Sequence, residues 1–142
     1  ILLLDDIIGF VGDRECVKFV VPYFKRIYGA FDTKINILHN DANGLVSAPY
    51  YPEMGVNLFN PSFQHSLQEL KDLTDNNVAI LGNIPPRDVL ASGSPDDVRK
   101  AVETSLKNVK NRSGLILSCG GGMAPSTPTD NIQALISAAG VR

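Results

Sequence analysis

The strongest constraint on the fold is a repeated pattern of short apolar runs that end on polar residues. Such runs occupy residues 2–4, 35–38, 56–59, 78–81 and 115–117. A helical pattern or a turn follows each run, with helices expected at 13–30, 42–53, 64–73, from 94 and from 127 to 139. Alternation of strands and helices predicts a parallel sheet with right-handed crossovers. Five such units predict either a small open α/β sheet or the last five βα units of a (β/α)8 barrel.

Polar residues stand at the carboxyl end of each predicted strand, where parallel α/β folds place their ligand sites. These residues should therefore share one mouth. In chain order they are Asp5 and Asp6, then His39, Asn40 and Asp41, then Asn60, then Asn83, then Cys119 with Gly120, Gly121 and Gly122.

His39 and Asp41 are the first candidates for chemistry. They are two residues apart at a strand end, so both side chains should point to the same side. An imidazole beside a carboxylate suits a general acid–base pair or a metal site, although a histidine held by hydrogen bonds in a polar loop fits equally well. A zinc ion needs a third ligand, for which Cys119, Asp5 and Asp6 are available. Cys119 is alternatively a buried packing residue.

The other polar positions also allow a functional and a structural interpretation. Asp5 and Asp6 either bind a polar ligand or cap the turn after the first strand. Asn60 and Asn83 either line the mouth or form turns. The three glycines offer backbone N–H groups to a ligand, an anion included, or form a flexible turn. His65, at a helix start, is expected on the solvated surface.

Helix signals mark several element ends. Pro22 lies inside the pattern at 13–30 and should kink or divide that helix. Ser94 and Asp97 predict a capping box, with Pro95 at the first helical position. The same signal recurs at 127–130, and Gly140 should end the last helix.

Composition limits the classes of protein. The 142 residues suffice for one domain, and 44% hydrophobic with 20% charged residues is an ordinary globular composition. A net charge of −2 provides no basic field for nucleic acid. No apolar run approaches the roughly 18 residues of a membrane span. Two cysteines make no disulfide framework and predict a reducing, cytoplasmic setting. The chain opens inside an apolar run without Met, so we expect a fragment of a longer protein.

Taken together, several motifs resemble the uroporphyrinogen decarboxylase superfamily over essentially the whole chain. The motifs are Asp5-Asp6, the segment 19–27, His39-Asn40-Asp41, Gly-Asn-Ile-Pro-Pro at 82–86, Gly-Ser-Pro-Asp-Asp-Val at 93–98, the triple glycine and 127–132. The resemblance implies an eight-stranded (β/α) barrel, often dimeric, with its ligand cleft at the carboxyl ends of the strands. Residues 1–142 would then be the C-terminal part of that barrel domain.

Two activities are implied by this resemblance. One is cofactor-free decarboxylation of the acetate arms of uroporphyrinogen, and the other is methyl transfer to or from a corrinoid, often with zinc. The decarboxylases usually carry Gly-His-Gly where this chain has Gly120-Gly121-Gly122. The thiol-activating zinc enzymes usually show His-x-Cys, whereas Asp41 replaces that cysteine here and Cys119 lies two positions before the expected last ligand. The chain looks more like members that demethylate methoxylated or methylamine-type compounds.

The resemblance therefore implies a methyltransferase that works with a small methylated substrate and a corrinoid protein. His39 and Asp41 would orient or protonate the methyl donor, or hold a metal with Cys119. The substrate cavity would be lined by Asp5, Asp6, Asn60, Asn83 and the three glycines. The alternatives are a uroporphyrinogen decarboxylase and a non-catalytic ligand-binding relative. A homodimer, or association with a missing N-terminal half, is expected.

Overall fold

Five parallel strands form one sheet in the computed structural model, which describes residues 1–140. They are β1 (Leu2–Leu4), β2 (Ile37–Asn40), β3 (Leu58–Pro61), β4 (Ala79–Leu81) and β5 (Leu115–Ile116). Their order in the sheet is the order of the chain, β1-β2-β3-β4-β5. Because right-handed crossovers without a reversal of order leave every connection on the same side, the helices belong to one face of the sheet.

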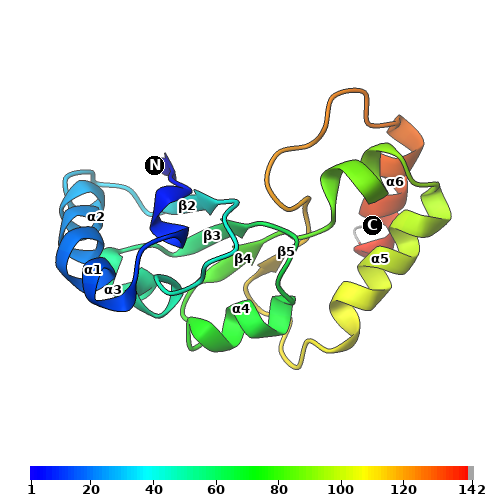
Figure 1. Ribbon diagram of the computed structural model, residues 1–142. Helices are drawn as coiled ribbons and strands as arrows, with labels where there is room; N and C mark the ends of the chain where they lie inside the picture. The colour runs from blue at the N-terminus through cyan, green and yellow to red at the C-terminus, as the bar shows by residue number, and fades with distance from the viewer. Residues whose placement is uncertain (141–142) are drawn as a thin grey trace.

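Helical segments connect the strands (Figure 1). Between β1 and β2 lie the 3-10 turn η1 (Ile7–Gly9), α1 (Asp13–Glu15), the π-helical segment η2 (Cys16–Val20) and α2 (Val21–Gly29). Between β2 and β4 lie η3 (Ala48–Tyr50), α3 (Tyr51–Met54) and α4 (Leu67–Leu73). The π-helical segment η4 (Pro86–Ala91) and α5 (Pro95–Lys107) follow β4, and α6 (Thr129–Ala138) follows β5. No helix within residues 1–140 is long and apolar enough to cross a membrane.

The helix-covered face of the sheet contributes the main hydrophobic core. Leu38, Phe59 and Ile80 are side by side in the strand register and at most 1% exposed. They pack with apolar residues of α2, α3 and α4, and the rings of Tyr51 and Phe59 meet edge to face at 4.8 Å. Side chains alternate along a strand, so the residues on either side of this layer must point the other way.

The opposite face of the sheet is uncovered. Leu4, His39 and Asn60 stand next to one another in the register, and Leu2 lies one layer below them. Leu2 and Leu4 are 51% and 70% exposed. This face therefore carries apolar residues together with the polar pair on β2 and β3.

A second hydrophobic cluster lies beyond β5. There α5 packs against α6, and Figure 1 shows the two helices side by side at that end of the molecule. Its buried members are Ile84, Leu90, Val98, Val102, Cys119, Ala134 and Leu135.

Two element boundaries differ from the sequence prediction in ways that matter for the site. The second strand runs over Ile37–Asn40, so His39 and Asn40 belong to the strand and not to the turn after it. The helix expected over 42–53 is confined to 48–54, and a loop precedes it. That loop contains the Asn43-Gly44 turn pair, which favours a turn over a helix.

The predicted helix signals were mostly correct. The interruption expected near Pro22 is the π-helical segment that directly precedes α2. Ser94 and Asp97 form the predicted capping box, and Gly140 follows α6 at a φ of 76°. The cap predicted at Thr127 is wrong, because its hydroxyl donates to the Ala124 carbonyl at 2.8 Å and α6 begins after Pro128 without a side-chain cap.

Candidate active site

A chain of hydrogen bonds across three adjacent strands holds His39 on the uncovered face. Asn60 of β3 donates from Nδ2 to the Leu81 carbonyl of β4 at 2.6 Å. Its Oδ1 lies 2.8 Å from Nδ1 of His39 on β2. A carbonyl oxygen only accepts, so the bond to Leu81 fixes which end of the Asn60 amide faces the imidazole.

This arrangement sets the tautomer of His39. Because Asn60 presents its oxygen, Nδ1 of His39 must carry a proton and donate it. The other ring nitrogen, Nε2, lies 3.4 Å from Oδ2 of Asp41. With the proton on Nδ1, Nε2 is an acceptor, and it repels the carboxylate oxygen of Asp41 at that distance. The contact is favourable when a further proton lies on Nε2 or on Oδ2. His39 and Asp41 can thus hold a proton and deliver it to a ligand.

Asp41 is held by the loop after β1. Its backbone N–H donates to Oδ1 of Asp6 at 2.7 Å. Oδ1 of Asp5 accepts from the backbone of Ile7 at 2.8 Å and of Ile8 at 3.3 Å. Asp5 therefore caps the η1 turn, which is the structural role that the sequence also allowed. Asp6 positions the backbone of Asp41.

Sequence reasoning missed the contact that joins the two loops. A Cβ on Gly44 would overlap the carbonyl oxygen of Gly9, and one on Gly9 would overlap the Ala42 side chain. The loops after β1 and β2 therefore meet backbone to backbone. Beneath them the buried Asn40 accepts from the Ala42 N–H at 2.7 Å. The Asn43-Gly44 pair is the sequence signal that marked this turn.

The buried Tyr51 lies under the same loops. Its hydroxyl accepts from Oγ of Ser47 at 3.2 Å. Burial raises the pKa of Tyr51 to about 12, and hydrogen bonding by Ser47 opposes that rise. The phenol is thus neutral at physiological pH, and it supports the loop without adding a charge.

The three glycines after β5 have different surroundings. A Cβ on Gly120 would lie 2.7 Å from the Phe63 backbone nitrogen, so Gly120 permits close packing. A Cβ on Gly121 would lie 2.6 and 2.8 Å from the two carboxylate oxygens of Asp41. Gly122 has open space around it. The carboxylate beside Gly121 disfavours the anion that the sequence allowed at this turn.

Part of the candidate site lines a small cavity of about 250 Å³ on the uncovered face, and Asp5, Asp6, Asp41 and Gly120 are not among its lining residues. His39, Asn60, Gly121 and Gly122 form its polar end, and the apolar wall consists of Leu2, Leu4, Ile37 and Leu81. Neither lysine nor arginine is among these lining residues, which all belong to the part of the chain that the structure describes. The cavity thus offers an apolar wall and the imidazole of His39 to a small ligand.

Comparison with known proteins identifies the family. The family model for uroporphyrinogen decarboxylase (URO-D) matches residues 1–140. The chain belongs to the uroporphyrinogen decarboxylase family. The predicted resemblance is thereby confirmed.

The chain is similar both to proteins named as methyltransferases and to proteins named as uroporphyrinogen decarboxylases. The methylcobamide:CoM methyltransferases MtbA of Methanosarcina mazei and of Methanosarcina acetivorans are each 31% identical over 136 residues, covering 91% of this chain and 37% of their own. A uroporphyrinogen decarboxylase of Koribacter versatilis is 25% identical, covering 95% of this chain and 38% of its own. The chain thus spans a little over a third of the length of these relatives.

The solved structure of a methyltransferase from Methanosarcina mazei has the same fold. It superposes with a TM-score of 0.81 at 18% identity, covering 96% of this chain and 40% of that one. Together with the sequential parallel sheet, this likeness confirms the prediction of a partial (β/α)8 barrel.

The zinc site that the family resemblance raised is not assembled within residues 1–140. No three His, Cys, Asp or Glu side chains gather there in a group that could hold a metal ion. Cys119 is 6% exposed within the second hydrophobic cluster, and its Sγ donates to the Gly121 carbonyl at 3.2 Å. Cys119 as a metal ligand beside His39 and Asp41 therefore stays a prediction, and in this structure its thiol packs as a small apolar group.

Asn83 is also placed away from the cavity. It is 5% exposed, and its Nδ2 donates to the His65 carbonyl. Nε2 of His65 lies 2.8 Å from the Asn43 carbonyl and Nδ1 lies 3.3 Å from Oε2 of Glu69. Asn83 thus fixes the loop after β3, and His65 connects loops instead of lying free on the surface as expected.

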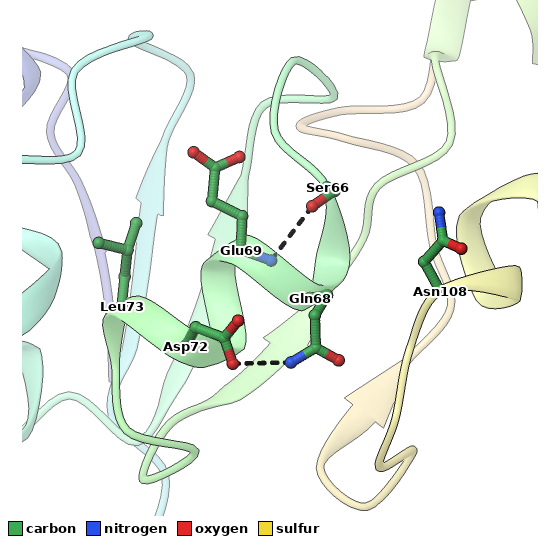
Figure 2. A pocket seen from close by; sticks show the side chains of 6 residues that line it. All are labelled: Ser66, Gln68, Glu69, Asp72, Leu73 and Asn108. Carbon is green, nitrogen blue, oxygen red and sulfur yellow. Dashed lines mark hydrogen bonds between the residues drawn. The ribbon is translucent and has the colours of Figure 1, made fainter.

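A larger hollow lies on the helix side, beside α4 (Figure 2). Its volume is about 600 Å³, and Ser66, Gln68, Glu69, Asp72, Leu73 and Asn108 line it. Oγ of Ser66 caps α4 by accepting from the Glu69 N–H at 3.1 Å, and Gln68 donates to Asp72 at 2.7 Å. Oε1 of Gln68 also accepts from the Lys110 N–H at 2.9 Å, so the polar side chains here hold α4 and the loop after α5. The cavity at His39, with its contact to Asp41, is the candidate active site.

Proposed function

We propose that this chain forms part of a methyltransferase that moves a methyl group between a small methylated compound and a corrinoid carried by a partner protein. The observation that carries the proposal is the His39–Asp41 contact, held by Asn60 at the polar end of an apolar cavity. The similarity to enzymes named methylcobamide:CoM methyltransferase supports methyl transfer as the type of reaction.

The proposed role of the pair is proton donation to the leaving atom. Demethylation of an ether or amine breaks a bond between carbon and oxygen or nitrogen, and the electron pair of that bond stays on the heteroatom. A reduced corrinoid on the partner protein would accept the methyl group, and a proton from Nε2 of His39 would neutralise the heteroatom. Asp41 stabilises the imidazolium before transfer, and water resupplies the proton afterwards. The apolar wall of Leu4, Ile37 and Leu81 suits the methyl group.

The charges near the cavity favour this proposal over decarboxylation of uroporphyrinogen. The Asp41 carboxylate lies beside His39 and Gly121, which line the cavity, and the Asp6 carboxylate accepts from the Asp41 backbone N–H. A substrate that presents acetate arms would meet carboxylates on this part of the barrel, and like charges repel. Relatives named uroporphyrinogen decarboxylase keep that activity as the second candidate.

The proposal includes partners for the uncovered face. Leu2, Leu4 and Ile116 are at least half exposed there, and exposed apolar patches of this kind mark interaction surfaces. Further strands of the barrel, or a second copy, would cover them in the working enzyme. We place the enzyme in the cytoplasm, since Cys16 and Cys119 are both free thiols.

The test is a direct comparison of reactions by the purified protein. The protein is incubated with cob(I)alamin and a set of methylamines and methoxylated compounds, and methylcobalamin is followed by its absorbance. We expect methylcobalamin to form with at least one donor. Decarboxylation of uroporphyrinogen without methyl transfer would support the second candidate. Ligand binding with neither reaction would indicate a non-catalytic relative.

A further inference from the structure

Gly121 and Asp41 come from distant parts of the chain and share one space. A Cβ built on Gly121 would lie 2.6 Å from Oδ1, 2.8 Å from Oδ2 and 3.1 Å from Cγ of Asp41. These are the three nearest atoms to it, and all belong to the carboxylate. The same atom built on Gly122 would have nothing within 4 Å. Competition with Asp41 is thus specific to position 121 and is not a general property of the glycine turn.

The carboxylate of Asp41 has little freedom to avoid such a side chain while keeping its contact with His39. The Asp41 backbone is tied to Oδ1 of Asp6, which fixes where the side chain starts. Oδ2 of the carboxylate lies 3.4 Å from Nε2 of His39, and both carboxylate oxygens lie within 2.8 Å of the position that a Cβ on Gly121 would take. Its side chain is 48% exposed, so rotation into solvent is the open alternative. A methyl group at position 121 would drive the carboxylate along that route.

We propose that Gly121 is a positioning residue for the candidate acid–base pair. Its missing side chain provides the space in which the Asp41 carboxylate lies against His39, so a side chain at 121 and the His39–Asp41 contact exclude each other. The residue at 121 thereby decides whether Nε2 of His39 has an acidic partner. This inference rests on the proposed role of the pair, yet its test needs no turnover.

The first test is the ¹⁵N resonance of Nε2 of His39 in four variants. Gly121→Ala is expected to move this resonance in the same direction as Asp41→Ala, and the double variant is expected to match Asp41→Ala alone. Gly122→Ala adds the same methyl group one residue along and is expected to leave the resonance at its wild-type position. A wild-type resonance in Gly121→Ala, with a moved one in Asp41→Ala, would overturn the inference. No movement in Asp41→Ala would instead remove the His39–Asp41 contact on which the proposed function depends.

The second test separates the steric contact from backbone strain. Gly121 has a φ of 74°, so alanine at this position is strained whatever its surroundings. That strain is the same with and without Asp41, whereas the overlap disappears when Asp41 becomes alanine. Thermal unfolding should therefore show a smaller loss of stability from Gly121→Ala in the Asp41→Ala background than in the wild type. Equal losses in the two backgrounds would contradict the proposal, even if Gly121→Ala alone is too unstable for spectroscopy.

Discussion

Two of the hollows on this molecule differ in how their polar residues are used. The larger one, about 600 Å³, lies along α4, and its polar side chains cap that helix, bond to one another within it or, in the case of Gln68, also accept from the Lys110 backbone. The smaller one, about 250 Å³, is lined by residues from four strands and the glycine turn. Its His39 is bonded from β3, and Asp41 is held from the loop after β1.

The candidate site is therefore identified by side chains from several strands that meet at one place, and not by the volume of the hollow. A helix presents polar side chains at three- and four-residue spacing wherever it faces solvent, and these pair locally. Side chains from separate strands meet only because the sheet register brings them together. The hydrogen bonds from Leu81 through Asn60 to His39 span three strands and fix one tautomer of the imidazole. Bonds within a single helix or strand would not produce this arrangement.

Replacing His39 should have the largest effect on the reaction if His39 acts as proposed. His39→Ala removes the group that donates the proton, and general acid catalysis is typically worth about 100-fold to 10,000-fold in rate. We expect the rate of methylcobalamin formation to fall by about 100-fold or more. Gln68→Ala, on the larger hollow, is the matched control and should keep the wild-type rate. A similar loss in both variants would contradict the assignment of the site.

The contact between Gly9 and Gly44, which joins the loops after β1 and β2, should be sensitive to a single methyl group. Gly44→Ala would overlap the Gly9 carbonyl oxygen and force the two loops apart. Overpacking of this kind typically costs about 1–3 kcal/mol, so the free energy of unfolding in urea should fall by about that amount. Gly29→Ala, where no atom lies within 4 Å of the added carbon, should change it little. Equal effects at the two glycines would argue that the loops are not in contact.

The helix side should respond through stability alone. Ser94→Ala removes the side-chain cap of α5, which typically contributes about 1 kcal/mol, and it should leave methyl transfer unchanged. Thermal unfolding and the cobalamin assay together measure both outcomes. A changed transfer rate with an intact fold would show that the two regions are coupled.

The same cap predicts a pH dependence. Hydrogen bonds from the Ser94 side chain and backbone hold the pKa of Asp97 below its ordinary value. A lowered pKa in the folded state means that this stabilisation is present above the pKa of the unfolded carboxyl and is lost as the pH falls through the folded value. The melting temperature of Asp97→Asn should therefore depend less on pH in the acid range than that of the wild type. Parallel curves for the two proteins would contradict the capping assignment.

The smallest effect is expected on the larger hollow. Asp72→Ala removes an exposed acceptor for Gln68, and such surface changes usually shift the free energy of unfolding by less than about 0.5 kcal/mol. Urea denaturation measures this directly. A much larger loss would mean that the hollow contributes more than helix pairing.

The sequence predicted the parts of the fold that follow local periodicity. Strand and helix alternation, the Ser94 capping box and the helix end at Gly140 are encoded within a few residues each. Thr127 had the same cap pattern and failed, because its hydroxyl found the Ala124 carbonyl instead. A local sequence pattern predicts which hydrogen bonds a side chain is able to make. Which of them forms depends on the other acceptors within reach.

For the candidate site, the sequence predicted the residues of β2 and β3 better than the others. His39 and Asp41 share a side because strand geometry has a period of two, and the structure places them in contact. Cys119 and Asn83 follow strands as well, yet Cys119 bonds within its own turn, Asn83 bonds to the loop after β3, and neither lines the cavity. The Gly9–Gly44 contact depends on two loops that are 35 residues apart, so no spacing rule reveals it.

The most direct test of this account is the tautomer of His39, measured by ¹⁵N NMR of its ring at a pH where the imidazole is neutral. The account predicts a proton on Nδ1, because Nδ1 must donate to Oδ1 of Asn60 while Nδ2 of Asn60 is bonded to Leu81. Asn60→Leu removes that acceptor and should release the preference. A neutral ring with its proton on Nε2 in the wild type would contradict the hydrogen-bond chain on which the candidate site depends.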